Sequence, residues 1–419
     1  MKTKKINYVL LLSFLLLLIP GCDNSDYLSI DDDLVLGKAG NPKVMPSTAT
    51  DVLIKAQEDW QNINDALQDA KSGEVVQLGK GLFYLHKSII RWNFNGTLKG
   101  SGMDKTTIQT VPGELFDVSE CPPLKFSFKT TDGFFMFCFA HNYNKEIRTV
   151  AVSDMTIIVD EPTTPYYQYR PGEDPEEGNS IQALHVQYEN IDNDLVNPVN
   201  LNVMYKNLTV IGEKDNGKYL NTGYSLYAGL AAFGASSGKF EAKNVHVENA
   251  NVCILPIAFS GDESTITVKN SSLNSCSDGV SSFLGHSWTI LENEIENSNF
   301  GIVLLKTGAS LSSWEGPDGS SYVKNNRVHF MGVLGLGVQF VKNVQVKDNV
   351  FEGNGNFGIA SVAGDNWIIK DNDLCGVNAL PIFIVSLMNS EIKDNANQVI
   401  GGPGASEPSN IIGEGRECN

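Results

Sequence analysis

A short phrase that returns at a constant interval restricts the fold of this chain more than any other feature. Val-Lys-Asp-Asn ends at Asn349, and Ile-Lys-Asp-Asn ends at Asn372 and Asn395, so that 23 residues separate successive copies. Upstream the phrase weakens, but asparagine keeps the register at Asn207, Asn244, Asn270, Asn293 and Asn326. A unit of about 23 residues therefore repeats along the chain, with occasional insertions.

A fixed period of roughly 20 to 50 residues is typical of solenoids, in which each repeat buries its apolar face only against its neighbours. Between the asparagines lie three short β-branched runs separated by Gly/Asn turns, which leave no room for a helix. The sequence thus predicts an all-β parallel β-helix with strands about 4.8 Å apart. The recurrent asparagine is expected to adopt the left-handed conformation and to bond along the stack. A generic turn preference would not explain the period.

The N-terminus has the features of an export signal. Three lysines in the first five residues precede an apolar run at residues 9–19, which is too short for a spanning helix. The following Pro20-Gly21-Cys22 resembles a bacterial lipobox, in which the cysteine becomes the lipidated N-terminus, although Pro20 stands where a small residue is usual. We expect a signal peptide at residues 1–21 and lipidation at Cys22; the alternative is an ordinary signal with a chance cysteine.

Residues 22–50 are rich in Asp, Ser, Gly and Pro and are interpreted as a flexible tether. The β-helix domain then occupies residues 51–419. Trp60, Ile63, Leu67 and Ala70 recur at helical spacing before Gly73, and they predict a short amphipathic helix that covers the open end of the solenoid.

Two glycine-rich turns follow this helix. Gly79-Lys80-Gly81 precedes Phe83-Tyr84, and Gly100-Ser101-Gly102 precedes Thr106-Thr107-Ile108. With the helix, these turns resemble the pectin-lyase-like, right-handed parallel β-helix superfamily, over residues 51 to about 402. The resemblance implies a fold but not one activity, because the superfamily holds lyases, hydrolases, epimerases and non-catalytic binders.

Enzymes of this superfamily act on the sheet whose strands follow the Gly/Asn turn. Its strands are predicted here at residues 134–140, 181–187, 224–233, 252–259, 280–283, 302–305, 338–341, 359–362 and 382–385. Long insertions adjoin several of them, notably residues 161–179, 212–223 and 310–319, and insertions in a solenoid often build the binding surface.

Catalytic groups are not evident on the C-terminal strands of this sheet. The residues predicted to point outward are uncharged, namely Leu255, Ser281, Val303, Gln339, Ala360 and Phe383. Glycosidic hydrolysis ordinarily needs two carboxyl groups. The Asp-Pro-His-Glu motif of mannuronan epimerases is also absent. The pattern therefore argues against an active site on these coils.

Charge and cysteine content limit the ligands. Loss of three lysines with the signal leaves 28 basic against 49 acidic residues, a net charge of −21. Nucleic acid is not an expected partner. A polyuronate would be repelled unless a cation or a local Arg/Lys pocket intervened, whereas a neutral polysaccharide would not be. The six cysteines after Cys22 show no CxxC spacing, so no metal site is expected. Cys253 and Cys276 lie at unequal offsets from their asparagines and are interpreted as buried small apolar residues.

The candidate carbohydrate-binding site lies in the first half of the chain. Tyr166, Tyr169 and Arg170 share one insertion, and the neighbouring predicted strands carry His185, Gln187 and Tyr224. Aromatic rings with amide and guanidinium donors suit a sugar ring. The alternative is that these tyrosines only cover the flank of the solenoid.

Two function classes stay open. The first is a lipid-anchored protein of the bacterial cell envelope, expected at the outer membrane, that binds and cleaves a polysaccharide as a lyase or glycoside hydrolase. The second is a non-catalytic binding or structural lipoprotein of the cell surface. Catalytic residues stay unassigned, and no cofactor is expected, except Ca²⁺ for a lyase.

The anchoring hypothesis predicts that Cys22→Ser releases the protein from the membrane fraction or leaves it unprocessed, because the lipid supplies the membrane affinity. Fractionation and the mass of the N-terminal peptide measure this. Unchanged fractionation and processing would contradict it.

Overall fold

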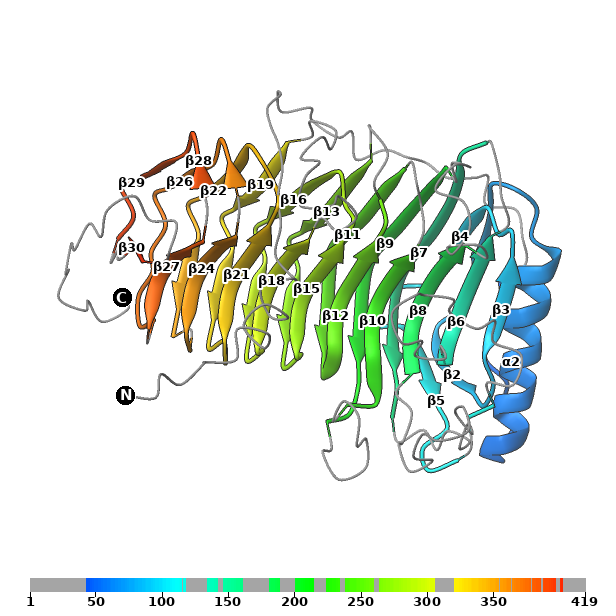
Figure 1. Cartoon of the computed structure of the whole chain (residues 1–419). Helices are drawn as coiled ribbons and strands as arrows, with labels where there is room; N and C mark the ends of the chain where they lie inside the picture. The colour runs from blue at the N-terminus through cyan, green and yellow to red at the C-terminus, as the bar shows by residue number, and fades with distance from the viewer. Residues whose placement is uncertain are drawn as a thin grey trace, which may run out of the picture.

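The fold is that of a computed structural model, described for residues 43–114, 116–117, 134–141, 146–160, 181–188, 200–214, 224–233, 238–259, 264–305, 320–353, 355–362, 364–377, 379–385, 387–396 and 400–401. The strands stack in parallel as one elongated solenoid with a single described helix at its N-terminal end (Figure 1). This confirms the predicted all-β parallel β-helix. No helix within the described ranges is long and apolar enough to cross a membrane.

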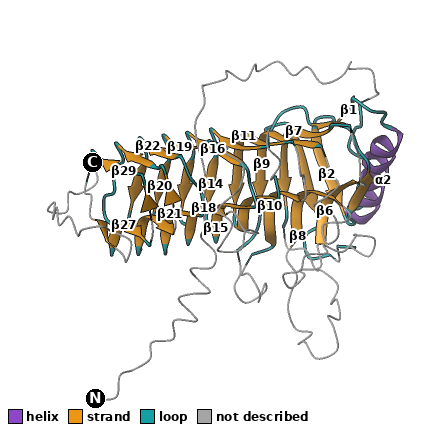
Figure 2. Cartoon of the chain, turned by 45° about the horizontal axis from the view of Figure 1, so that its top comes forward, coloured by secondary structure: helices purple, strands orange, loops and turns teal. Residues whose placement is uncertain are grey.

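Two large parallel sheets form the walls of the solenoid (Figure 2). The 17-stranded sheet turns a corner within each coil, since β11 pairs with both β13 and β14. Its strands are β1 (Glu74–Gln77), β2 (Gly81–Leu85), β4 (Gly96–Lys99), β5 (Thr106–Thr110), β7 (Arg148–Ile158), β9 (Leu201–Ile211), β11 (Lys239–Glu248), β13 (Thr265–Lys269), β14 (Ser272–Asn274), β16 (Ser287–Leu291), β17 (Glu294–Glu296), β19 (Ser321–Lys324), β20 (Arg327–His329), β22 (Val344–Lys347), β23 (Val350–Glu352), β26 (Ile368–Lys370) and β29 (Glu391–Lys393).

The 11-stranded sheet carries the strands that follow the Gly/Asn turns. They are β3 (Ile89–Trp92), β6 (Phe134–His141), β8 (Ile181–Tyr188), β10 (Leu226–Phe233), β12 (Ala250–Ile257), β15 (Asp278–Phe283), β18 (Phe300–Leu305), β21 (Leu334–Gln339), β24 (Phe357–Val362), β27 (Leu380–Ile384) and β30 (Ile400–Gly401). A small third sheet pairs β25 (Gly364–Asp365) with β28 (Leu387–Met388). One predicted strand was misplaced. The sequence predicted a strand at residues 338–341, whereas β21 ends at Gln339. Gly335 and Gly337 interrupt the apolar pattern of β21 and obscured its start.

The helix α2 (Val52–Asp69) closes the N-terminal end, as predicted, but it is longer than the sequence pattern indicates. Asp51 caps it by accepting hydrogen bonds from the backbone N–H groups of Leu53 and Ile54. Ile63 and Leu67 are buried in the interior of the solenoid, and the helix ends at Asp69 rather than at Gly73. The cap therefore hides the apolar interior of the first coil from water.

The recurrent asparagines occupy two adjacent positions rather than one. Asn326, Asn349 and Asn372 are buried, and each side-chain amide donates to the Oδ1 atom of the next asparagine along the stack at 2.9, 2.9 and 2.8 Å. The left-handed residue is the one before them, as at Asp348 (φ 56°) and Asp371 (φ 57°). The predicted hydrogen bonding along the stack is confirmed. The prediction that the bonding asparagine is itself left-handed is wrong, because the left-handed residue is the one before it.

The upstream asparagines divide between these two positions. Asn293 belongs to the buried ladder and donates to Asn326 Oδ1 at 2.9 Å. Asn207, Asn244 and Asn270 are left-handed turn residues, and Ser271 takes the ladder position in the coil of Asn270. The serine backbone N–H donates to Asn293 Oδ1 at 3.1 Å, so the ladder continues through a different side chain.

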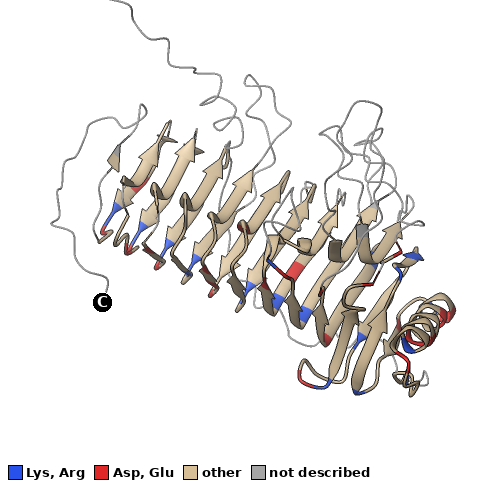
Figure 3. Ribbon diagram, turned by 90° about the horizontal axis from the view of Figure 1, so that it is seen from below, with Lys and Arg blue, Asp and Glu red and all other residues tan. Residues whose placement is uncertain are grey.

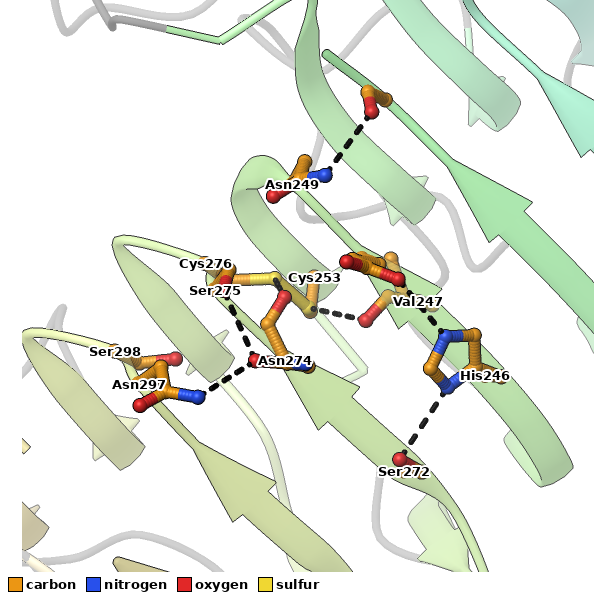
Figure 4. The surroundings of a disulfide bond; sticks show 12 residues. His246, Val247, Asn249, Cys253, Ser272, Asn274, Ser275, Cys276, Asn297 and Ser298 are labelled. Atoms are coloured by element: carbon orange, nitrogen blue, oxygen red, sulfur yellow. Dashed lines mark hydrogen bonds and ion pairs between the residues drawn. A yellow bond between two sulfur atoms is a disulfide. The ribbon is translucent and has the colours of Figure 1, made fainter. Parts of the chain in front are cut away.

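The prediction for Cys253 and Cys276 is wrong, because these two residues form a disulfide (Figure 4). Cys253 lies on β12, whereas Cys276 lies in the turn before β15 of the next coil. The chain bends between these positions, which brings the two Cα atoms to 5.9 Å despite their unequal offsets. Both side chains point into the core. Cys375 is also disulfide-bonded.

Removing one ladder amide should destabilise the solenoid. Asn349 Nδ2 donates to Val323 O at 2.8 Å and to Asn372 Oδ1 at 2.9 Å, and both bonds are buried. Asn349→Ala is expected to lower the free energy of unfolding by about 1 to 3 kcal/mol, because buried partners lose their hydrogen bonds. Denaturant unfolding measures this, with Thr267→Ala on the outside of β13 as the control, expected within about 0.5 kcal/mol of the parent. Equal losses in both variants would contradict the ladder's contribution.

Candidate functional site

The outward-pointing side chains of the 11-stranded sheet form a continuous surface along the solenoid, here called the outer face. Strand pairing arranges them in three rows, and they form clusters separate from the interior core. The first row is Phe135, Gln182, Ala228, Val252, Asp278, Phe300, Leu334, Phe357 and Leu380. The second is Ile90, Cys138, His185, Ala231, Leu255, Ser281, Val303, Gly337, Ala360 and Phe383, and the third is Trp92, Ala140, Gln187, Phe233, Ile257, Phe283, Leu305, Gln339 and Val362.

Ionisable groups are scarce in these rows. Apart from the buried Cys138, the titratable side chains of the three rows are His185 and Asp278. Asp278 accepts a hydrogen bond from Ser281 Oγ at 2.6 Å, and burial raises the pKa of this carboxyl above its ordinary value. The two groups lie three strands apart, roughly 14 Å at the usual strand spacing. They are too distant to act as an acid and base pair on one bond.

The outer face matches the sequence prediction closely but not completely. Leu255, Ser281, Val303, Ala360 and Phe383 lie in the second row, as predicted. Gln339 lies in the third row, because β21 places Gly337 beside Val303 and Ala360. The conclusion that these outward residues are uncharged is unaffected.

Large side chains project from this surface while short ones lie beneath their neighbours. Phe283, Phe300, Phe357 and Phe383 are partly exposed, and the rings of Phe357 and Phe383 lie 4.9 Å apart. Leu255, Leu305 and Ala360 between them are buried. Gln339 is fully buried, and among the described residues neither atom of its amide has a hydrogen-bond partner. The accessible part of the face is therefore aromatic, with an amide below it.

His185 lies at the centre of a buried cluster at the N-terminal part of the face. Its ring stacks on Phe135, with centroids 4.2 Å apart, and approaches Phe233 at 4.8 Å. Nδ1 lies 2.8 Å from Gln182 Oε1, and Nε2 lies 3.1 Å from Gln187 Oε1. A neutral imidazole donates through one nitrogen and accepts through the other, so one of the two amides must present its NH₂ group.

The structure brings together only some of the predicted site residues. His185 and Gln187 are hydrogen-bonded to each other and buried. Tyr224 is also buried, but it precedes β10 and lies near the end of β8 that is farther from Gln187. Tyr166, Tyr169, Arg170 and Cys22 lie outside the described residues. The site assignment therefore stays a prediction.

A row of lysines on the 17-stranded sheet was missed in the sequence, and Figure 3 shows it as a line of blue segments along the solenoid. Strand pairing aligns Lys99, Lys206, Lys243, Lys269, Lys324, Lys347, Lys370 and Lys393, with Ser153 and Leu291 completing the row. Acidic residues neutralise much of its charge, as in the ion pairs Lys99–Asp154 at 3.5 Å, Lys206–Glu241 at 3.3 Å, Lys269–Glu292 at 3.4 Å and Lys370–Asp371 at 3.0 Å. A polyanion would have to compete with these carboxylates, so the row is not a strong anion site.

An ionic cluster on β17, β20 and β23 was also missed. His329 Nε2 lies 3.6 Å from Glu294 Oε1 and 3.4 Å from Glu296 Oε2, and Arg327 pairs with Glu352 at 3.0 Å. The sequence does contain a clue, because each of these residues stands one or three positions after a ladder asparagine. Its charges pair internally, and within the described ranges no group of three or more His, Cys, Asp or Glu residues is arranged to hold a metal ion.

The buried histidine makes stability depend on pH. Burial lowers the pKa of His185 from 6.5 to about 3. An unfolded chain gains this proton as the pH falls below 6.5, whereas the folded chain excludes it until about pH 3. The stability contributed by the neutral ring is therefore complete above pH 6.5 and is lost as the pH falls toward 3.

Between pH 7 and pH 5 this loss amounts to about 2 kcal/mol, at 1.36 kcal/mol per pH unit below 6.5. His185→Gln should lose about that much less stability than the parent over the same range in denaturant unfolding. His141, whose pKa burial also lowers to about 3, stays in both proteins and is the internal control. Identical pH dependence in parent and variant would contradict the assignment.

Comparison with known proteins agrees with this architecture. A family model described as periplasmic copper-binding protein (NosD) matches residues 243–405. No curated protein sequence is significantly similar to the chain.

Among solved structures, the A-module of the mannuronan C-5 epimerase AlgE6 from Azotobacter vinelandii is similar over 86% of this chain and 87% of its own, with 12% identity and a TM-score of 0.56. The catalytic unit of a thermostable GH87 α-1,3-glucanase from Streptomyces thermodiastaticus is similar over 89% of this chain and 70% of its own, with 14% identity and a TM-score of 0.38. At such identities the likeness concerns the fold alone. The chain therefore carries a parallel β-helix fold like that of the epimerase module.

Proposed function

We propose that this protein binds a polysaccharide along its outer face. The observation that carries the proposal is the series of partly exposed rings of Phe283, Phe300, Phe357 and Phe383 on a surface almost free of charge. A sugar ring has an apolar face that packs on aromatic rings and hydroxyl groups that bond to amides. Eleven strands about 4.8 Å apart extend this face over roughly 50 Å, which is long enough for several sugar residues.

The ligand is expected to be uncharged. The mature chain carries a net charge of −21, which repels a polyuronate, and the lysine row is neutralised by its acidic neighbours. A neutral glycan packs on this face without burial of a charge.

Binding without cleavage is the function that the outer face supports best. Hydrolysis ordinarily requires two carboxyl groups, either about 5 Å or about 6.5 to 9.5 Å apart. Among the described residues of the three rows, Asp278 is the one carboxylate. The epimerase motif Asp-Pro-His-Glu is absent from the sequence, so the likeness to an epimerase module is not extended to its reaction. Cleavage by a lyase or hydrolase, with or without Ca²⁺, is the alternative, and it would require groups from outside the three rows.

The location that fits this function is the bacterial cell envelope. The family model that matches residues 243–405 describes a periplasmic protein, and the N-terminus predicts export and lipid attachment at Cys22. Anchoring at the outer membrane would hold the outer face among envelope or extracellular glycans.

Binding to a panel of neutral and acidic polysaccharides, with and without Ca²⁺, tests the proposal. Phe300→Ala combined with Phe383→Ala should weaken binding of the preferred neutral glycan by about tenfold or more, because each ring contributes apolar contact. Thr267→Ala on the 17-stranded sheet is the matched surface control. Retention of full affinity by the double phenylalanine variant, with an unchanged melting temperature, would contradict binding at the outer face.

A second set of variants separates the outer face from the predicted insertion site. If Tyr166, Tyr169 and Arg170 bind the sugar, their simultaneous replacement by alanine abolishes binding while the phenylalanine variant retains it. Release of reducing or unsaturated sugars during incubation would identify the protein as an enzyme and overturn binding without cleavage.

A further inference from the structure

The first turn of α2 is apolar on several sides and exposed to solvent. The exposed fractions are 39% for Val52, 48% for Leu53 and 55% for Ile54, and the preceding Met45 is 53% exposed. Successive helix residues are turned by about 100°, so three consecutive exposed residues cannot all belong to one face of a packed helix. This turn therefore projects from the domain as an apolar tip.

The tip is capped by hydrogen bonds, and it is unusual among the described residues. The Asp51 carboxylate accepts hydrogen bonds from Leu53 and Ile54 N–H at 2.9 and 3.0 Å, which fixes the backbone of the turn. The other large apolar side chains that are exposed among the described residues, Ile147, Phe330 and Met388, are far apart in the sequence. Exposed apolar residues that gather in one place mark a contact surface more often than single ones do.

The position of the tip in the chain indicates what it contacts. Only residues 23–42 separate the predicted lipid-bearing Cys22 from the described chain. These 20 residues reach at most about 70 Å when fully extended. The tip at residues 52–54 is thus within reach of the bilayer that receives the lipid.

We propose that Val52, Leu53 and Ile54 insert into the surface of the bilayer beside the lipid anchor. This inference rests on the proposed lipid attachment at Cys22 but not on polysaccharide binding. Because α2 lies at one end of the solenoid (Figure 1), this contact directs the capped end toward the membrane. One acyl chain gives only marginal membrane binding, and an additional apolar contact strengthens it.

The charges near the tip specify the kind of lipid surface. Asp51 and Glu58 are exposed at the start of the helix, whereas Lys55 forms an ion pair with the buried Asp59 at 3.1 Å. Acidic residues beside an inserting turn are repelled by anionic lipid. Insertion should therefore be stronger in zwitterionic than in anionic bilayers.

The test uses the full lipidated protein in phosphatidylcholine vesicles. A fluorophore is attached at Leu53→Cys in one variant and at Ile147→Cys in another, since Ile147 is also exposed, at 64%, but lies outside the tip. The parent protein measures background labelling. Brominated phospholipids should quench the probe at position 53 at least about twofold and leave position 147 unquenched, because an inserted residue reaches the acyl boundary. Replacing phosphatidylcholine by phosphatidylglycerol should reduce the quenching.

Equal quenching at the two positions, or none at position 53 in protein whose N-terminal peptide carries the lipid, overturns insertion of the tip. An unmodified Cys22 removes the premise and overturns it as well. Polysaccharide binding by the same labelled proteins is measured in parallel, so failure of the membrane contact is distinguished from failure of the outer face to bind.

Discussion

Every coil of this protein lies one strand spacing, about 4.8 Å, from the next, and each side chain must therefore be compatible with its equivalents above and below. The buried asparagine ladder meets this requirement in the interior. Each amide supplies a donor to the next residue and an acceptor to the previous one, so that no ladder member inside the stack leaves a polar group unpaired. The 23-residue period in the sequence is the consequence of this pairing.

Because of the same constraint, equivalent surface side chains of successive coils line up in rows along the solenoid. Lysines in register would repel one another, and the acidic residues beside them at Asp154, Glu292 and Asp371 offset this repulsion. Uncharged side chains in register need no such compensation, and the outer face can present phenylalanine rings at intervals from β15 to β27. A linear polymer meets similar contacts at each of these strands.

Sequence patterns were sufficient for the period, the parallel sheets and the capping helix, because these depend on local spacing of apolar and turn residues. They were insufficient where a shift of one residue decides whether a side chain lies in a turn or in the buried ladder. Lys-Asn and Lys-Asp-Asn look alike in sequence, yet Asn270 is a turn residue and Asn349 a ladder residue. The disulfide of Cys253 and the cluster of His329 depend on which positions a corner brings together in space. For the site, the contact of His185 with Gln187 was predictable from strand alternation, whereas its complete burial was not.

The disulfide between Cys253 and Cys276 also has a mechanical meaning. A solenoid held by nearest-neighbour contacts can come apart one coil at a time from an end. Unravelling from the C-terminal end that has passed the disulfide-bonded Cys375 would next meet the covalent link between these two coils. This link then acts as a stop, because pulling on the free end cannot separate coils that share a bond. The N-terminal coils, which carry the His185 cluster, lie behind this stop.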